Sequence, residues 1–140
     1  MLLFPDIDRS AELVRHCWRT GVEHRSDEFT LLFYGLLFDA EPGIEQLFPR
    51  DVREQRRHLM EMMDFLVMND LHRPEIKEQV RRMAREHFGP HVPIGLFLTV
   101  SATMCHALSI MLEDRWDRDL AMAWRTVSRQ IYDVIVYDYV

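Results

Sequence analysis

The chain has 140 residues, of which 48% are hydrophobic, and its formal net charge at pH 7 is -6. This length suits a single domain, residues 1–140, with a sizeable core, and the apolar content excludes a disordered chain. An acidic chain lacks the strongly basic surface that nucleic acids and anionic membranes attract, so neither is an expected partner.

The first half of the sequence predicts four helical stretches. Ser26 precedes two acidic residues, and Asp51 stands three residues before Glu54, a pattern typical of a capping box. Pro49 ends a short stretch that opens at Glu41-Pro42. The expected helices run from Asp8 or Ser10 to about Val22, from Ser26 to about Asp39, from Glu41 to Phe48, and from Asp51 to about Met68.

The second half predicts three more. Asn69-Asp70 breaks the preceding helix, and Pro74 stands where a first helical residue belongs. The expected helices run from Pro74 to about Phe88, from Pro93 to about Glu113, and from Asp117 toward the C-terminus. Strand propensity is high in the run IYDVIVYDYV, but no second strand is predicted for it to pair with, so we expect a helix end there.

The stretch 88–112 contains no Asp, Glu, Lys or Arg. An uncharged stretch of this length is a candidate membrane span. Hydroxyl-bearing residues, His106 and the glycine and prolines at its start interrupt it, so we expect the central helix of a soluble core. Cys17 and Cys105 lie in apolar helical patterns without metal-binding spacing. Because the opening MLLFPDID lacks the features of a signal peptide, we expect two buried thiols in a reducing cytoplasm.

Three segments carry a family resemblance: FYGLLFDAEPGIEQLFP, then EQRRHLM, then VRRMAREHFGPHV. In this order and spacing they resemble the globin family, and in particular the single-domain bacterial globins and the haem domain of flavohaemoglobins. The resemblance covers about residues 10–136. It implies an all-α globin fold in which six to eight helices surround a pocket for haem b (heme b).

The resemblance assigns the iron ligand to His87, which stands just before a Gly-Pro break at a helix end. A neutral imidazole binds haem iron well, and a single axial histidine leaves the opposite side open to a diatomic gas such as O2, NO or CO. Tyr34 corresponds to the distal tyrosine of bacterial globins, whose hydroxyl donates a hydrogen bond to bound oxygen.

Two residues compete for the second distal position. Gln55 stands 32 residues before His87, which suits the bacterial pattern, whereas His58 stands 29 residues before it, which suits the vertebrate pattern. Because Leu59 occupies the apolar distal position of the family, we favour Gln55 and expect His58 near the haem edge. Either could face the iron, since the two share a helix face.

The remaining haem contacts follow from the resemblance. Phe48 corresponds to the phenylalanine that stacks on the porphyrin. The apolar pocket is expected to be lined by Leu59, Met63, Met83, Val92, Phe97 and Val100.

One departure from the family bears on function. Flavohaemoglobins support the proximal histidine with a tyrosine and a glutamate. Here the matching tyrosine position holds Phe97, and the matching glutamate position falls near Tyr139, with Asp138 beside it. A weaker acceptor on the imidazole means less electron donation to the iron. The sequence therefore predicts reversible gas binding, for carriage, sensing or scavenging. The alternatives are nitric oxide dioxygenation with an external reductase and a bis-histidine redox sensor. Oligomeric state stays open.

Overall fold

The structure is a computed structural model that describes residues 7–47, 52–88 and 94–137. At Leu47, His87, Phe88, Ile94 and Tyr137 it describes the backbone but not the side chain.

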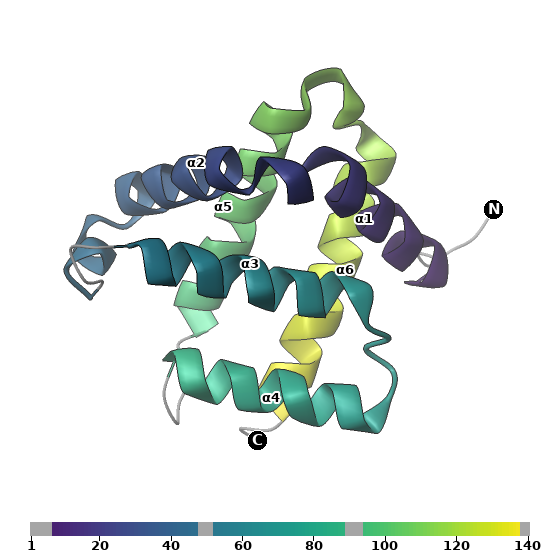
Figure 1. Cartoon of the computed structure of the whole chain (residues 1–140). Helices are drawn as coiled ribbons and strands as arrows, with labels where there is room; N and C mark the ends of the chain where they lie inside the picture. Colours follow the sequence, from purple (N-terminus) through teal and green to yellow (C-terminus); the bar gives the residue numbers. More distant parts are fainter. Residues whose placement is uncertain (1–6, 48–51, 89–93, 138–140) are drawn as a thin grey trace.

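Six α-helices and three short 3-10 turns make up the described part of the chain, in which no strand occurs (Figure 1). The helices are α1 (Ile7–Gly21), α2 (Ser26–Ala40), α3 (Arg53–Met68), α4 (Pro74–Phe88), α5 (Ile94–Leu112) and α6 (Arg118–Tyr137). The 3-10 turns are η1 (Glu23–Arg25), η2 (Pro42–Leu47) and η3 (Glu113–Arg115). The predicted all-α fold is confirmed, and the β-branched run near the C-terminus is helical as far as Tyr137, the last described residue.

Helix starts follow the sequence signals only in part. Asp117 caps α6 as predicted, since its Oδ1 accepts the backbone N–H of Leu120 at 2.8 Å. Ser26 was expected to cap α2 but is its first residue, and the capping position belongs to Arg25, which makes no side-chain capping bond. The proposed capping box of α3 is also wrong, because Val52 occupies the capping position, while Asp51 lies outside the described residues.

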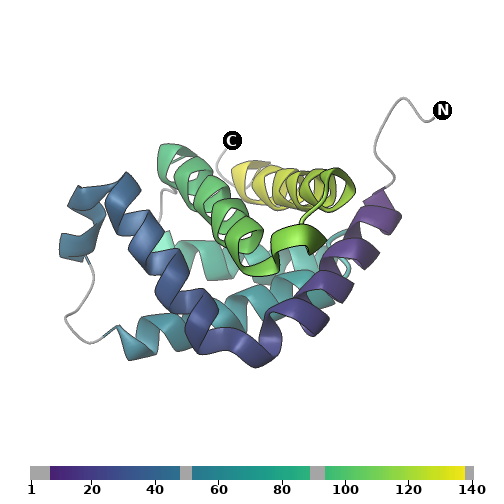
Figure 2. The same ribbon diagram turned by 90° about the horizontal axis from the view of Figure 1, so that it is seen from above.

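A few helix pairs account for most of the close packing. α1 lies against α6, and α2 lies against α5 and the start of α3 (Figures 1 and 2). α4 packs against α6, and α3 and α4 are not among the helix pairs in close contact within the described part of the chain. The side chains between α3 and α4 therefore decide what that space can hold.

Three arginines donate hydrogen bonds to backbone carbonyls at the C-terminal ends of other helices. Arg15 Nε donates to the Val67 carbonyl of α3 at 3.3 Å, Arg25 to the Met111 carbonyl of α5 at 3.5 Å. Arg81 Nε of α4 donates to the Val134 carbonyl of α6 at 3.1 Å. The last four carbonyls of a helix have no partner within it, and a cation there also interacts favourably with the helix dipole. The Arg81 bond fixes α4 on the end of α6.

An aromatic row crosses the core from α1 to α2. Trp18 meets Phe29 edge-on with ring centroids 5.5 Å apart, and Phe29 stacks on Phe33 at 6.2 Å. Phe33 in turn meets Tyr34 edge-on at 5.1 Å. Such pairs stabilise beyond the area they bury, so this row holds Tyr34 in a defined position.

The uncharged stretch forms α5. By length and composition, Gly95–Arg115 could cross a membrane, and 33% of its most apolar window is buried. Ala107 and Leu108 are fully buried, as expected of a core helix, but Leu98 and Ile110 are exposed. α5 is thus a core helix with one apolar face open to solvent.

Candidate functional site

An apolar cavity of about 90 Å³ lies between α3, α4, α5 and α6. It is enclosed by helix faces whose apolar residues recur every three or four positions, so each helix presents one side to it. α3 contributes Leu59, Met62, Met63, Leu66 and Val67; α4 contributes Val80, Met83 and Ala84. The polar side chains at its edge are Ser101 and Ser128, together with the Trp124 indole.

Five residues predicted to line the haem pocket surround this cavity. They are Leu59, Met63, Met83, Phe97 and Val100. Two others, Phe48 and Val92, lie outside the described residues.

Much of the cavity wall escaped the sequence analysis, above all the contribution of α6. Trp124, Val127, Ser128, Ile131 and Ile135 line it from that helix. Their spacing follows one helix face, and this periodicity was the available signal. The predicted lining residues came from the family resemblance, and none of its three motif segments lies in α6.

The apolar lining of the cavity suits a flat apolar group, but the present volume of the cavity is small for one. About 90 Å³ is well below the roughly 300–1,000 Å³ of a pocket for a drug-sized ligand. However, four lining residues are methionines: Met62, Met63, Met83 and Met104. Methionine is unbranched and has several rotatable bonds, so these side chains can move aside for a ligand.

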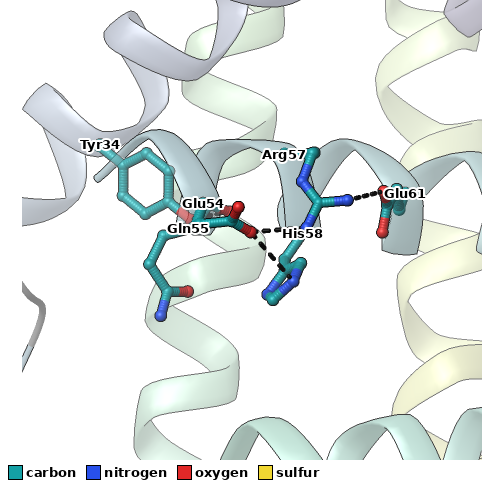
Figure 3. A network of polar contacts seen from close by, with 6 residues as sticks. All are labelled: Tyr34, Glu54, Gln55, Arg57, His58 and Glu61. Carbon is teal, nitrogen blue, oxygen red and sulfur yellow. Dashed lines mark hydrogen bonds and ion pairs between the residues drawn. The ribbon is translucent and has the colours of Figure 1, made fainter. Parts of the chain in front are cut away.

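Tyr34, on α2, contacts the start of α3 at Gln55, which precedes the cavity-lining residue Leu59 by four positions. Its ring is 8% exposed, and its hydroxyl donates to the backbone carbonyl oxygen of Gln55 at 3.2 Å (Figure 3). Burial raises the pKa of Tyr34 to about 12, so the phenol keeps its proton and remains a donor at neutral pH. The predicted distal residues Tyr34 and Gln55 are therefore brought together, through the glutamine backbone.

The two distal candidates differ in exposure and register. In Figure 3 the side chains of Gln55 and His58 both leave α3 on the side toward α4. Gln55 is partly buried, and it precedes the cavity-lining residues Leu59 and Met62 by four and seven positions. The His58 side chain is 47% exposed, and its Nε2 lies 3.7 Å from Glu54 Oε2. Helical periodicity therefore places Gln55 closer to the middle of the cavity face.

The basic stretch around the distal candidates is largely paired. Arg57 bonds to Glu54 at 2.6 Å and to Glu61 at 2.9 Å, both within its own helix (Figure 3). Arg56 reaches Asp27 of α2 at 3.2 Å. Exposed pairs of this kind contribute little to stability, and they describe a solvated helix face.

His87 occupies the last turn of α4, and its side chain lies outside the described residues. It follows Val80, Met83 and Ala84, all of which line the cavity, by seven, four and three positions. These are the spacings that share one face of a helix. By its backbone register, His87 belongs to the cavity side of α4.

The position expected to support the proximal histidine carries no polar group. The Phe97 ring packs against Tyr132 of α6, with centroids 5.7 Å apart. Asp138 and Tyr139, the matching acid region, lie outside the described residues.

Comparison with known proteins gives one family. The sequence model of the globin family matches residues 31–135, which include most of α2 and extend into α6. No curated protein matches the chain in a sequence search. The family match covers well over half of the 140 residues and agrees with the helical architecture, the apolar cavity and the register of its walls. The chain belongs to the globin family, whose members in general bind haem iron and oxygen.

Proposed function

We propose that this globin binds haem b in the cavity between α3 and α4, with His87 as axial ligand, and binds a diatomic gas reversibly on the α3 side. The observation that carries the proposal is the common cavity face of the two helices. Leu59 and Met63 form one wall and Met83 and Ala84 the other, with His87 in register on the same side of α4. An apolar site with few polar groups is what a largely apolar macrocycle requires.

When bound, haem would supply an iron that takes a diatomic gas, and His87 would hold that iron. The chain's own distal contribution is a hydrogen-bond donor, the Tyr34 hydroxyl. Because this hydroxyl already bonds to the Gln55 carbonyl, it must rotate or share its proton to reach a bound gas. The net gain is then the difference between two hydrogen bonds, each of which contributes about 0.5–1.5 kcal/mol.

A single axial histidine is favoured over a bis-histidine site. The His58 side chain is 47% exposed, and its Nε2 lies 3.7 Å from Glu54 Oε2. Gln55 has the better register, and a carboxamide is a weak ligand for ferrous haem. Gas therefore has an open coordination position to enter.

Nitric oxide dioxygenation is the second candidate, because the Tyr34–Gln55 pair resembles the distal side of bacterial globins. It requires an external reductase. Phe97 packs on Tyr132 and offers no hydrogen bond to an axial imidazole, so little electron donation to the iron is expected from this position. We favour carriage, sensing or scavenging of gas for this reason.

A cytoplasmic location completes the proposal. Cys17 and Cys105 are both free thiols; Cys17 is buried as expected, whereas Cys105 is only partly buried, which corrects the expectation of two buried thiols. Burial raises the pKa of each, which lowers the share of the reactive thiolate. Unpaired thiols agree with a reducing compartment.

The proposal is tested by filling the cavity. Val100→Trp places a large ring inside it, whereas Leu98→Trp adds the same ring on the exposed face of the same helix, where Leu98 is 57% exposed. Haem titration followed by the Soret absorption should give uptake in the parent and in Leu98→Trp but not in Val100→Trp. Equal uptake by both variants, with both helical by circular dichroism, would place haem elsewhere.

A further inference from the structure

A groove of about 590 Å³ lies between α5 and α6, which run in opposite directions (Figure 1). This volume falls within the roughly 300–1,000 Å³ of pockets that hold small organic ligands. Leu98 and Tyr132 stand at one end of the groove, and Cys105 and Arg125 stand at the other. Leu98 and Cys105 are seven residues apart, so the groove is about 10 Å long at a helical rise of about 1.5 Å per residue.

Arg125 places an uncompensated positive charge at its end of the groove. Within the part of the chain that the structure describes, its guanidinium takes part in no hydrogen bond or ion pair. Arg129, four positions later on the same helix face, is paired with Asp133 at 3.0 Å. Two cations four positions apart on a helix repel each other. An anion bound at Arg125 would relieve this repulsion, and no acidic side chain is among the described residues that line the groove.

Two serine hydroxyls extend this polar end. Ser128 stands three positions after Arg125, and Ser101 stands four positions before Cys105, so each shares a helix face with its neighbour in the groove. Both serines are partly buried, and neither hydroxyl makes a hydrogen bond among the described residues. A hydroxyl donates one hydrogen bond, and a guanidinium donates two parallel bonds to a carboxylate. Arg125, Ser128 and Ser101 thus form a set of donors suited to a carboxylate.

The Cys105 thiol supports the position of this charge. Burial raises the pKa of Cys105, and the positive charge of Arg125 acts against this rise. The guanidinium therefore lies close enough to the α5 side of the groove for a bound anion to contact both helices.

The other end of the groove is aromatic. The ring centroids of Phe97 and Tyr132 are 5.7 Å apart, with the planes inclined by 51°, and both residues are partly buried. Leu98 beside them is 57% exposed, which leaves apolar surface open to solvent. Aromatic rings attract one another at centroid separations of about 4.5–7 Å, so a further ring suits this end of the groove.

We propose that the groove between α5 and α6 binds an aromatic carboxylate, with its carboxylate on Arg125 and Ser128 and its ring against Phe97 and Tyr132. A chain of a few carbons between the ring and the carboxylate matches the length of the groove. An inorganic anion would leave the aromatic end open, and a neutral aromatic molecule would leave the Arg125 charge uncompensated. Binding is non-covalent, and it does not depend on the proposed haem site.

The groove shares part of its wall with the apolar cavity. The side chains that line both are Phe97, Ser101 and Ser128. Ala102 and Arg125 line the groove but not the cavity, whereas Val100 lines the cavity but not the groove. Substitutions at these unshared positions therefore distinguish a ligand in the groove from a ligand in the cavity.

The role of the charge is tested by isothermal titration calorimetry of the full-length protein with 3-phenylpropanoate. The comparison ligand is 3-phenylpropan-1-ol, which keeps the ring and the chain but carries no charge. We expect the acid to bind at least about tenfold more tightly than the alcohol, because hydrogen bonds to charged groups are the stronger ones. Arg125→Gln should remove this preference. Arg118→Gln, at an exposed arginine of α6 that does not line the groove, should retain it.

The location is tested by Ala102→Trp, at an exposed position of the groove. The indole should fill the groove and abolish binding of the acid, whereas Val100→Trp, which fills the cavity, should leave it intact. Cys105 gives a local measurement: the acid should slow its alkylation by iodoacetamide in the parent and not in Arg125→Gln. Cys17, which is 3% exposed, is the internal reference for mass spectrometry.

Three results would overturn the proposal. These are equal affinity of the acid for the parent, Arg125→Gln and Ala102→Trp; no saturable binding at millimolar concentrations; and loss of binding in Val100→Trp alone, which would place the acid in the cavity. Haem uptake by the parent and by Ala102→Trp, followed by the Soret absorption, tests the proposed function separately. Failure of one proposal is therefore distinguishable from failure of the other.

Discussion

The Tyr34 hydroxyl donates a hydrogen bond to the backbone carbonyl of Gln55 across 3.2 Å, and this bond ties the middle of α2 to the first turn of α3. The phenol is therefore already satisfied before any ligand is present. The proposed bond to a gas ligand would therefore use the same hydroxyl that joins the two helices.

Tyr34→Phe removes the donor and keeps the ring that packs against Phe33. We expect oxygen to dissociate up to about fivefold faster, because the hydroxyl gains only the difference between its bond to oxygen and its bond to the Gln55 carbonyl, at most about 1 kcal/mol. Stopped-flow displacement of oxygen by carbon monoxide measures this rate. Tyr132→Phe is the control, since Tyr132 is not among the cavity-lining residues, and an equal acceleration there would show that the effect is not distal.

Stability at high pH should depend on Tyr34. Its pKa is raised from 10 to about 12 by burial, so the folded state holds the phenolic proton more tightly than the unfolded state does. The unfolded state loses this proton first, and stability should therefore be intact below about pH 10 and fall as the pH rises toward 12. The full loss is on the order of 2–3 kcal/mol. Urea unfolding should show a steeper fall with pH in the parent than in Tyr34→Phe, whose own slope reflects groups such as Cys17 and Cys105, since burial raises the pKa of both thiols too. Parallel curves would contradict the prediction.

Replacing glycine by alanine should have opposite effects on stability at Gly21 and at Gly35. A Cβ at Gly21 would lie 2.6 Å from Leu112 Cδ2, in a buried contact, whereas nothing lies within 4 Å of a Cβ at Gly35, inside α2. Gly21→Ala should lower the free energy of unfolding by about 1–3 kcal/mol, and Gly35→Ala should raise it by about 0.5–1 kcal/mol. Thermal or urea unfolding compares the two, and equal shifts would mean that Leu112 moves freely.

The distal register is decided by a second pair of variants. His58→Ala should leave the ferrous absorption spectrum unchanged, because the His58 side chain is 47% exposed and lies beside Glu54. Gln55→Leu should instead alter the bound-oxygen spectrum and its lifetime. A low-spin parent that becomes high-spin in His58→Ala would reverse the assignment and favour a redox sensor.

Sequence signals located the helices well, because breakers such as Asn69-Asp70 and Pro74 act locally. Asn69 Nδ2 donates to the Phe65 carbonyl, and the Asp70 carboxylate accepts the His72 N–H, which together end α3 as the pattern predicted. Capping was less predictable: Ser26 lies inside α2 because η1 runs directly into it.

The candidate site was predicted at motif positions and missed elsewhere. Leu59 and Met83 line the cavity as expected. The periodicity of α6 marks which of its faces is apolar, but local patterns do not say which other helices that face packs against. The same limit applies to Tyr34, whose bond to the Gln55 carbonyl needs a tertiary contact between α2 and α3. The Phe97–Tyr132 contact likewise joins residues far apart in the sequence.

The central claim, that His87 binds haem iron, is tested most directly by the ferrous absorption spectrum of His87→Gly with and without added imidazole. An axial histidine that leaves a cavity when replaced by glycine should be replaceable by free imidazole. The account predicts that His87→Gly changes or loses the five-coordinate ferrous spectrum of the parent and that imidazole restores it. A ferrous spectrum that is the same in His87→Gly as in the parent would contradict the assignment.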